Sequence, residues 1–327
     1  MSAQNLTIVQ AVRDGLYTEM KQDGDVVVLG EDVGKNGGVF RATEGLYDEF
    51  GGDRVIDTPL AESGIVGTSI GMAAYGLKPV PEMQFSGFMY PAFDQIVSHA
   101  ARLRNRSRGR FTCPMVVRAP YGGGIRAPEH HSESKEAFYA HEAGLKVVIP
   151  STPYDTKGLL ISAIRDPDPV IFLEPKLIYR AFRGEVPEED YEVPIGEAAV
   201  RREGTDISVF TYGAMSRPTV EAAENLEEEG VSVEVVDLRT VSPLDEETIV
   251  ESFKKTGRAA VVHEAPKKGG LAGEITAVIQ EEALLYQEAP VERITGFDVP
   301  FPLYALEDYY LPSVARIEEG IRNAVGF

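Results

Sequence analysis

The stretch DTPLAESGIVG, Asp57 to Gly67, joins a predicted strand to a predicted helix. The strand covers residues 54–56, and the helix is predicted to begin at Ser63, whose hydroxyl can cap it. The helix continues with small residues at 64, 67, 71, 73 and 74, a composition that suits close backbone packing rather than solvent exposure. A strand, a turn and a closely packed helix in succession are typical of parallel α/β folds.

Glu62 lies at the start of this helix. A carboxylate there interacts favourably with the helix dipole, which by itself explains its presence. The same position also orients the acid before any ligand arrives, so Glu62 is a candidate binding or catalytic group. The segment alone leaves both interpretations open.

The rest of the chain repeats the alternation of strand and helix, which predicts parallel sheets throughout. Strands are predicted at 26–29, 54–56, 78–82, 115–118, 145–149, 170–173, 207–211, 231–236, 259–263 and 291–295. Helices are predicted from Thr7 with a Thr7–Gln10 capping box, from Ser63, at 91–104, around 133–141, from Thr152, and at 216–229, 245–255, 271–286 and 312–325.

The length of 327 residues allows two domains, at roughly 150 residues each. Between residues 174 and 205 the chain is polar and interrupted by three prolines. We therefore predict a first domain over residues 1–185, a linker over 186–204 and a second αβ domain over 205–327.

The charge is strongly negative, at −20, and among the 32 basic residues 21 are Arg and 11 are Lys. Such a field repels nucleic acid and anionic membranes, so neither is an expected partner. An acidic, lysine-poor composition is also what adaptation to high salt produces, because salt screens the self-repulsion. The one basic run, RLRNRSRGR over residues 102–110, closes a predicted helix and favours a structural or subunit-contact role.

No apolar run approaches the roughly 18–20 residues that span a bilayer. The first five residues have neither a basic region nor an apolar core, so no signal peptide is expected. The single cysteine, Cys113, cannot form an internal disulfide, and its apolar neighbours favour a core position. These features predict a cytoplasmic protein.

Three further groups could carry chemistry. Two histidines lie in the predicted loop Glu129-His130-His131-Ser132, where one can act as an acid or base. Zinc binding is the weaker alternative, because no usual ligand spacing is present. Gly122-Gly123-Gly124 lacks the Lys and Ser/Thr of a phosphate loop and favours a flexible or closely approached turn. Phe85, Phe88 and Tyr90 are either core residues or a stacking surface for a flat ring.

Seven stretches also occur in one known family in this order. They are LGEDVG (29–34), DTPLAE (57–62), PAFDQI (91–96), HSES (131–134), GLKVVIP (144–150), VDLRT (236–240) and HEA (263–265). Through them the chain resembles, over nearly its whole length, the beta subunit of the thiamine-diphosphate-dependent, decarboxylating first component of 2-oxoacid dehydrogenase complexes. The resemblance implies an α/β fold: a pyrimidine-type, thiamine-diphosphate-binding parallel-sheet domain followed by a domain like the transketolase C-terminal domain.

By matched position, the resemblance implies roles for four residues. Glu62 would be the acid on N1′ of the cofactor pyrimidine, and Phe88 the aromatic side chain against that ring. His131 would act on the substrate side and in acyl transfer to lipoamide. Glu31 matches an acid in the buried polar path between paired active sites.

The family often holds a structural potassium ion, largely by backbone carbonyls. The matching positions are Cys113, Met115, Val116, Ala163, Asp166 and Asp168. Val116 has no hydroxyl where some members have Thr, a departure from the pattern.

Thiamine enzymes bind magnesium and diphosphate through G-D-G and a later Asn, which this sequence lacks. In the resembled family the alpha subunit supplies them. The resemblance therefore implies half of an active site, an α2β2 heterotetramer, a 2-oxo acid substrate (pyruvate or branched-chain) and a lipoyl acyltransferase partner. The alternatives are an acetoin dehydrogenase beta subunit, a split transketolase-like subunit, or a non-catalytic scaffold.

Overall fold

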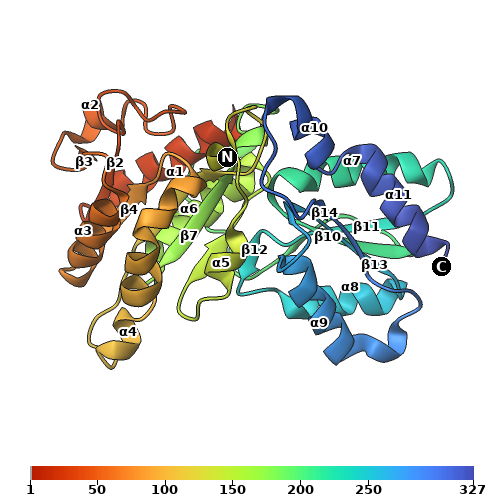
Figure 1. Ribbon diagram of the computed structural model, residues 1–327. Coiled ribbons are helices and arrows are strands. Elements are labelled where there is room, and N and C mark those ends of the chain that lie inside the picture. The colour runs from red at the N-terminus through yellow and green to blue at the C-terminus, as the bar shows by residue number, and fades with distance from the viewer. Residues whose placement is uncertain (1) are drawn as a thin grey trace.

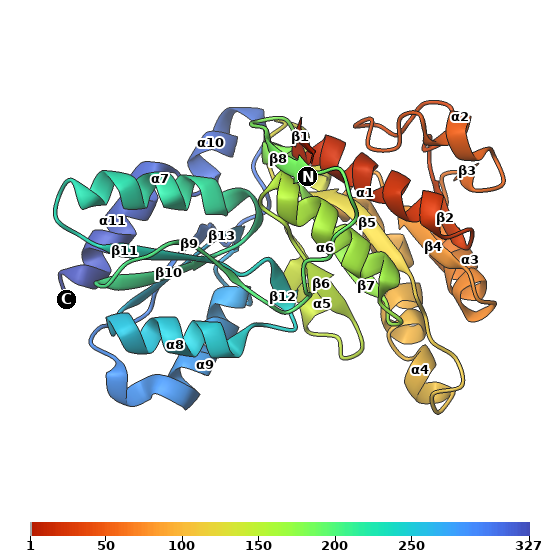
Figure 2. The same ribbon diagram turned by 180° about the vertical axis from the view of Figure 1, so that it is seen from behind.

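The computed structural model describes residues 2–327 and contains two αβ units that lie side by side (Figure 1). The first half of the chain builds a seven-stranded sheet, and most of the second half builds a five-stranded sheet. Figure 2 shows the same two units from behind, with α1 and α6 crossing the first sheet.

The helices are α1 (Ile8–Gln22), α2 (Leu46–Phe50), α3 (Glu62–Ala74), α4 (Leu103–Arg106), α5 (Glu136–Ala140), α6 (Pro153–Arg165), α7 (Ser216–Glu227), α8 (Glu246–Thr256), α9 (Leu271–Ala283), α10 (Glu307–Tyr310) and α11 (Val314–Val325). The strands of the first half are β1 (Ala3–Leu6), β2 (Val26–Gly30), β3 (Val55–Asp57), β4 (Lys78–Glu82), β5 (Val116–Tyr121), β6 (Lys146–Val148), β7 (Val170–Pro175) and β8 (Gly184–Pro187). Those of the second half are β9 (Ala199–Arg202), β10 (Ile207–Thr211), β11 (Val233–Asp237), β12 (Thr240–Ser242), β13 (Ala259–Pro266) and β14 (Glu292–Gly296).

The first sheet has the order β12-β6-β7-β5-β4-β2-β3, and every pair except β12–β6 is parallel. Its central strands are buried on both faces, as their largely apolar sequences predict. The buried charges among them pair with one another, Arg118 with Glu82 and Glu174. Alternate residues point to opposite faces: Val116 packs with α1 and α6, whereas Val117 packs with α3 and the helical segment after it.

The second sheet has the order β14-β13-β10-β11-β9, parallel except for β9. Helices α7 and α11 cover one face, and α8 and α9 cover the other (Figure 1). Burial of both faces of each sheet explains why strand positions could be recognised from apolar runs alone.

The predicted helix over residues 91–104 is helical but not one regular α-helix. A 3-10 segment, η1 (Ser86–Ala92), contains Pro91 and leads into a π-helical segment, η2 (Gln95–Ala100), before the short α4. The Ala101 N–H donates to the carbonyl of Ile96, five residues back, at 3.0 Å. Pro91 has no N–H, so the winding changes around it.

Four short strands were not predicted: β1, β8, β9 and β12. β1 pairs with β8, and β9 is the edge strand of the second sheet although it lies inside the predicted linker, 186–204. β12 returns from the second half to extend the first sheet beside β6. Such strands have only three or four residues, so they carry too little pattern to be read from sequence. The division into two domains with this linker stays a prediction.

Within residues 2–327, no helix combines the length and apolar character needed to cross a bilayer.

Candidate functional site

Four of the predicted residues lie at one edge of the first sheet. Glu31 follows β2, Glu62 follows β3, Phe88 follows β4 and His131 follows β5. These strands are neighbours and parallel in the order β5-β4-β2-β3. Their carboxyl ends therefore meet at the same edge, the usual position of ligand sites in open α/β sheets.

Helix α3 begins at Glu62, one residue earlier than predicted. Ala61 is the N-cap residue and makes no side-chain cap, and Ser63 lies inside the first turn, so the expected capping by Ser63 is wrong. The backbone of Ala61 is not helical, so Glu62 is the first residue of α3. Its half-buried carboxylate has no hydrogen-bond or ion-pair partner among residues 2–327.

Glu31 and Glu62 are close enough to interact electrostatically. Burial, followed by the charges of Glu62 and Asp32, raises the pKa of Glu31 above its usual range. Glu31 can therefore hold a proton more readily than an isolated surface carboxylate. The β2 end is tightly packed: a Cβ on Gly30 would lie 2.7 Å from the carbonyl oxygen of Glu82.

Phe88 and His131 are in direct contact. Their ring centroids lie 5.0 Å apart in an edge-on arrangement, and Phe85 contacts both rings, at 5.4 Å from Phe88 and 4.6 Å from His131. His130 also packs against Phe88, with 5.5 Å between the ring centroids. The structure thus joins the predicted aromatic and histidine candidates into one cluster.

The His131 imidazole favours its neutral form. Burial lowers its pKa, and the positive charges of His130 and Lys176 lower it further, whereas Glu129 opposes them. Its Nδ1 is buried and has no hydrogen-bond partner in the described chain. A neutral, unpartnered imidazole can accept a proton or donate a hydrogen bond to a ligand.

The histidine loop is held against η1 by close backbone contacts. The Glu133 carbonyl accepts from the Ser86 hydroxyl at 2.9 Å and from the Gly122 N–H at 3.1 Å. A Cβ on Gly87 would lie 2.0 Å from the His130 carbonyl oxygen, so only glycine allows this approach. The Tyr90 hydroxyl donates to the Glu133 carboxylate at 2.8 Å.

The second half of the chain contributes to this edge, which the sequence did not indicate. The Gly123 N–H donates to Glu264 at 2.8 Å, and the Gly124 N–H donates to Glu307 at 2.6 Å. Lys176 donates to the Gly122 carbonyl. The triple glycine is thus a closely approached turn, one of its two predicted forms. For Lys176 and Glu264 the sequence offers one signal, a charged residue inside or directly after an apolar strand, whereas Glu307 follows an exposed stretch and has no such signal.

The six residues predicted to hold potassium lie around β5, α6 and β7, and four of them bind other protein groups. The Met115 carbonyl accepts from the Val170 N–H at 2.9 Å, and the Ala163 carbonyl accepts from the Asp166 N–H at 3.3 Å. The side chains of Asp166 and Asp168 pair with Lys146 and Arg104. A potassium site at Cys113, Met115, Val116, Ala163, Asp166 and Asp168 stays a prediction.

Within residues 2–327, no three His, Cys, Asp or Glu side chains gather in a way that could hold a metal ion. Cys113 is a core residue, as predicted: it is buried, and burial raises the pKa of its thiol to about 12.

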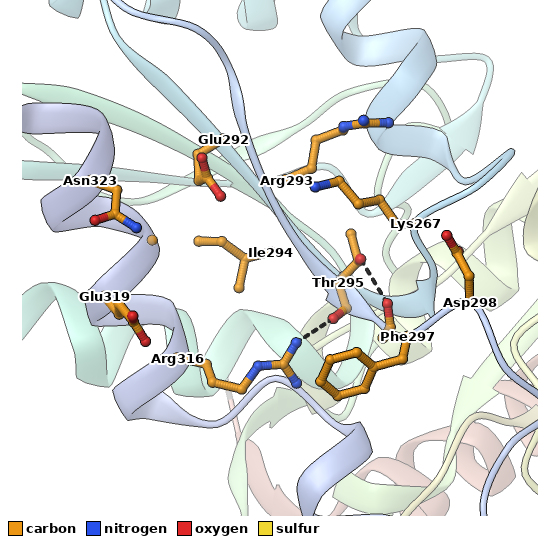
Figure 3. Close-up of a pocket in the computed structure, with 12 residues that line it drawn as sticks. Lys267, Glu292, Arg293, Ile294, Thr295, Phe297, Asp298, Arg316, Glu319 and Asn323 are labelled. Atoms are coloured by element: carbon orange, nitrogen blue, oxygen red, sulfur yellow. Dashed lines mark hydrogen bonds between the residues drawn. The ribbon is translucent and has the colours of Figure 1, made fainter. Parts of the chain in front are cut away.

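Five clefts on the described surface are lined by residues other than Glu62, Phe88 and His131. The cleft in Figure 3, about 350 Å³, lies between β14 and α11. Arg316 crosses it and donates to the Thr295 carbonyl at 2.6 Å while stacking on Phe297 at 4.6 Å. The Arg316 guanidinium is therefore already bound by other groups of the protein.

The residues at the sheet edge fit a bound thiamine-type pyrimidine. An unpartnered carboxylate, a half-buried aromatic side chain and a buried, unpartnered imidazole nitrogen lie along adjacent loops. These groups match an acid for a ring nitrogen, a stacking surface and a proton donor or acceptor. A diphosphate-binding motif is missing from the sequence.

Comparison with known proteins defines the class. Residues 4–181 match the family model described as "Transketolase, pyrimidine binding domain", and residues 196–317 match "Transketolase, C-terminal domain". The fold is similar to that of a solved "Split gene transketolase, inactive beta4 tetramer", with a TM-score of 0.81 over 99% of both chains at 22% sequence identity.

Closer relatives narrow this class. The chain is 55% identical to the pyruvate dehydrogenase E1 component subunit beta of Bacillus subtilis (strain 168) over 322 residues, 98% of this chain and 99% of the relative. It is 53% identical to the subunit of that name from Acholeplasma laidlawii over 318 residues, 97% of each chain. The chain belongs to the family of pyruvate dehydrogenase E1 beta subunits, which confirms the resemblance found in the sequence.

Proposed function

We propose that this chain is the beta subunit of a thiamine-diphosphate-dependent 2-oxoacid dehydrogenase. It would supply the pyrimidine half of each active site for oxidative decarboxylation and for acyl transfer to lipoamide on a partner acyltransferase. The observation that carries the proposal is the unpartnered Glu62 carboxylate, which lies beside Glu31 and at the same sheet edge as Phe88 and His131.

Each residue has a defined task in this proposal. Glu62 would bind the cofactor pyrimidine through its carboxylate, and Phe88 would pack against the ring. His131 would donate or accept a proton at the substrate, and Glu31 would extend a path for protons from Glu62. When bound, thiamine diphosphate supplies the electron sink for loss of carbon dioxide.

An alpha subunit would complete the site. Because the magnesium–diphosphate motif is missing from this sequence, the partner would hold Mg²⁺ and the diphosphate. We propose an α2β2 assembly with composite sites at α–β interfaces. The relatives are named for pyruvate dehydrogenase, which favours pyruvate over branched-chain 2-oxo acids as the substrate.

Substitution of Glu62 tests the catalytic assignment. In the complex reconstituted with the alpha subunit, Glu62→Gln keeps the size of the side chain but removes its charge, so we expect 2-oxo-acid decarboxylation to fall by at least about 100-fold. Glu247→Gln is the matched control, because Glu247 is also an acid in the first turn of a helix, in the second sheet's unit. Near-normal turnover of Glu62→Gln, or equal losses in both variants, contradicts the assignment.

Substitution of His131 separates the alternative functions. We expect His131→Ala to lose reductive acylation of the acyltransferase's lipoyl domain, measured by mass spectrometry. Absence of lipoyl acylation in the unsubstituted complex would favour transketolase-like chemistry, and absence of any turnover would favour a scaffold.

The half-site is tested with the purified chain alone. We expect isothermal titration calorimetry to detect no tight binding of magnesium–thiamine diphosphate until the alpha subunit is added. Tight binding by this chain alone contradicts the composite site.

A further inference from the structure

Lys176 is a buried cation next to the candidate site, and no role has been assigned to it. Only 4% of the residue is exposed. It lies in the short 3-10 segment η4 (Lys176–Ile178), directly after β7, and its ammonium donates to the carbonyl of Gly122. Burying a lysine is unfavourable unless the charge is paired, so its position needs an explanation.

The carboxylates around Lys176 come from the second half of the chain. Glu264 lies near the carboxyl end of β13, and Glu307 is the first residue of α10. Both are almost completely buried. Their negative charges favour protonated Lys176, although burial is the larger effect and lowers its pKa to about 8. The same two carboxylates bind the N–H groups of Gly123, Gly124 and Arg126, at 2.8, 2.6 and 3.1 Å.

A short series of contacts connects Lys176 with His131. The ammonium lies 5.9 Å from the centre of the Phe85 ring, and the Phe85 ring centre lies 4.6 Å from that of His131. The Gly122 carbonyl that Lys176 binds belongs to the turn whose N–H groups are bound by Glu133 and Glu264. Lys176 therefore contacts both the turn before the histidine loop and the aromatic ring behind His131.

We propose that Lys176, which lies near the Glu264 and Glu307 carboxylates, is a positioning residue: through the Gly122 carbonyl and the Phe85 ring it fixes the orientation of His131, and its charge disfavours a second cation there. The proposal rests on the proposed function of His131, and it gives the second sheet's unit a direct part in forming the active site.

The other charged groups around His131 are on its own loop and on the neighbouring η1. His130 adds to the effect of Lys176, and Glu129 opposes it. Glu133 is paired with Lys135 and accepts from the Tyr90 hydroxyl. Lys176 is thus the buried partner from a distant element, whereas the others lie within a few residues of His131 or have exposed side chains.

The test is to measure the protonation of His131 directly. The chain has five histidines, so labelling with [¹³Cε1]histidine gives a resolvable spectrum in the reconstituted complex, and His131→Gln assigns the signal. In Lys176→Met, we expect the His131 pKa to rise by about half a pH unit or more, because a nearby positive charge is lost. Lys176→Arg keeps the charge and should restore the original value.

Lys157→Met is the matched control. Lys157 is also fully buried; it donates to the Pro187 carbonyl at 2.7 Å, pairs with Asp14 at 2.8 Å and lies 5.6 Å from the Tyr191 ring. Lys157 is a residue of α6, which packs against α1 rather than against the histidine loop. We expect this variant to lose stability without changing the His131 pKa.

The outcomes separate this proposal from the proposed function. An unchanged His131 pKa in Lys176→Met, or an equal change in Lys157→Met, overturns the positioning role. If Lys176→Met does not fold, Lys176→Gln replaces it; its amide can still donate to the Gly122 carbonyl but carries no charge, so the His131 pKa should again rise. If the pKa changes but the acid limb of the acylation pH profile does not, Lys176 still positions His131, and it is the catalytic role of His131 that fails.

Discussion

His263 is a buried histidine whose charge is incompatible with the folded state. It has no exposed surface, and its Nδ1 lies 3.1 Å from the carbonyl oxygen of Ala265. Burial lowers its pKa to about 4, far below that of an unfolded histidine, near 6.5. The unfolded chain therefore binds one more proton than the folded chain between these two pH values.

The consequence is a loss of stability in acid. Because the folded pKa is depressed, the contribution of His263 is fully present above pH 6.5 and decreases as the pH falls toward 4. We expect the unfolding free energy of the natural protein to fall by about 2 kcal/mol more than that of His263→Gln between pH 7.5 and 5. Urea unfolding at both pH values measures this difference, and parallel pH dependences contradict it.

The turn of three glycines connects the two sheets' units, and it permits a prediction about backbone space. Gly122 has a φ of +78°, and a Cβ there would lie 2.4 Å from the Glu264 carboxylate. Gly109 has the same φ of +78°, but a Cβ there would meet no atom within 4 Å. Substituting alanine at both positions separates backbone strain from contact with Glu264.

We expect Gly122→Ala to lower the unfolding free energy by about 1–3 kcal/mol more than Gly109→Ala. We also expect only Gly122→Ala to reduce lipoyl acylation, because it displaces the turn before the His131 loop. Thermal unfolding and the acylation assay measure the two effects. Equal effects of the two substitutions would show that the Gly122–Glu264 contact is unimportant.

The elements that the sequence predicts are those that the two sheets bury. β2, β5, β10 and β11 are short, mostly apolar strands with no exposed residue. The predicted caps of α1 and α6 by Thr7 and Thr152 are also present. The unpredicted strands are short edge strands, and their pairing depends on segments far away in the sequence. β12, for example, joins β6 across about ninety residues of chain.

The candidate site likewise contains residues that the sequence could locate and residues that it could not. Glu62, Phe88 and His131 lie in motifs close to strand ends, so the sequence and the resemblance could locate them. Lys176, Glu264 and Glu307 meet only after the two halves of the chain pack together. No local pattern relates these positions, because the property that unites them is shared burial around one turn.

The negative charge is spread unevenly along the sequence. Five arginines lie between residues 102 and 110, and two of them pair with acids from other segments, Arg102 with Glu142 and Arg104 with Asp168. The basic run is thus partly a structural element, as expected. The remaining excess of acids leaves a net charge of −20, which disfavours the compact state through self-repulsion.

Salt should therefore stabilise the protein. We expect Tm to rise by several degrees between about 0.1 and 1 M NaCl, because the Debye length shortens from about 10 to 3 Å. A variant with Glu224→Lys, Glu281→Lys and Glu282→Lys provides the control, since these exposed acids have no ion pairs within residues 2–327 and each change adds two charges, from −20 to −14. Weaker self-repulsion should give this variant a higher Tm at low salt and a smaller dependence on salt. Differential scanning calorimetry measures the Tm of both proteins at low and high salt. Equal salt dependences of Tm would mean that general charge repulsion does not limit stability.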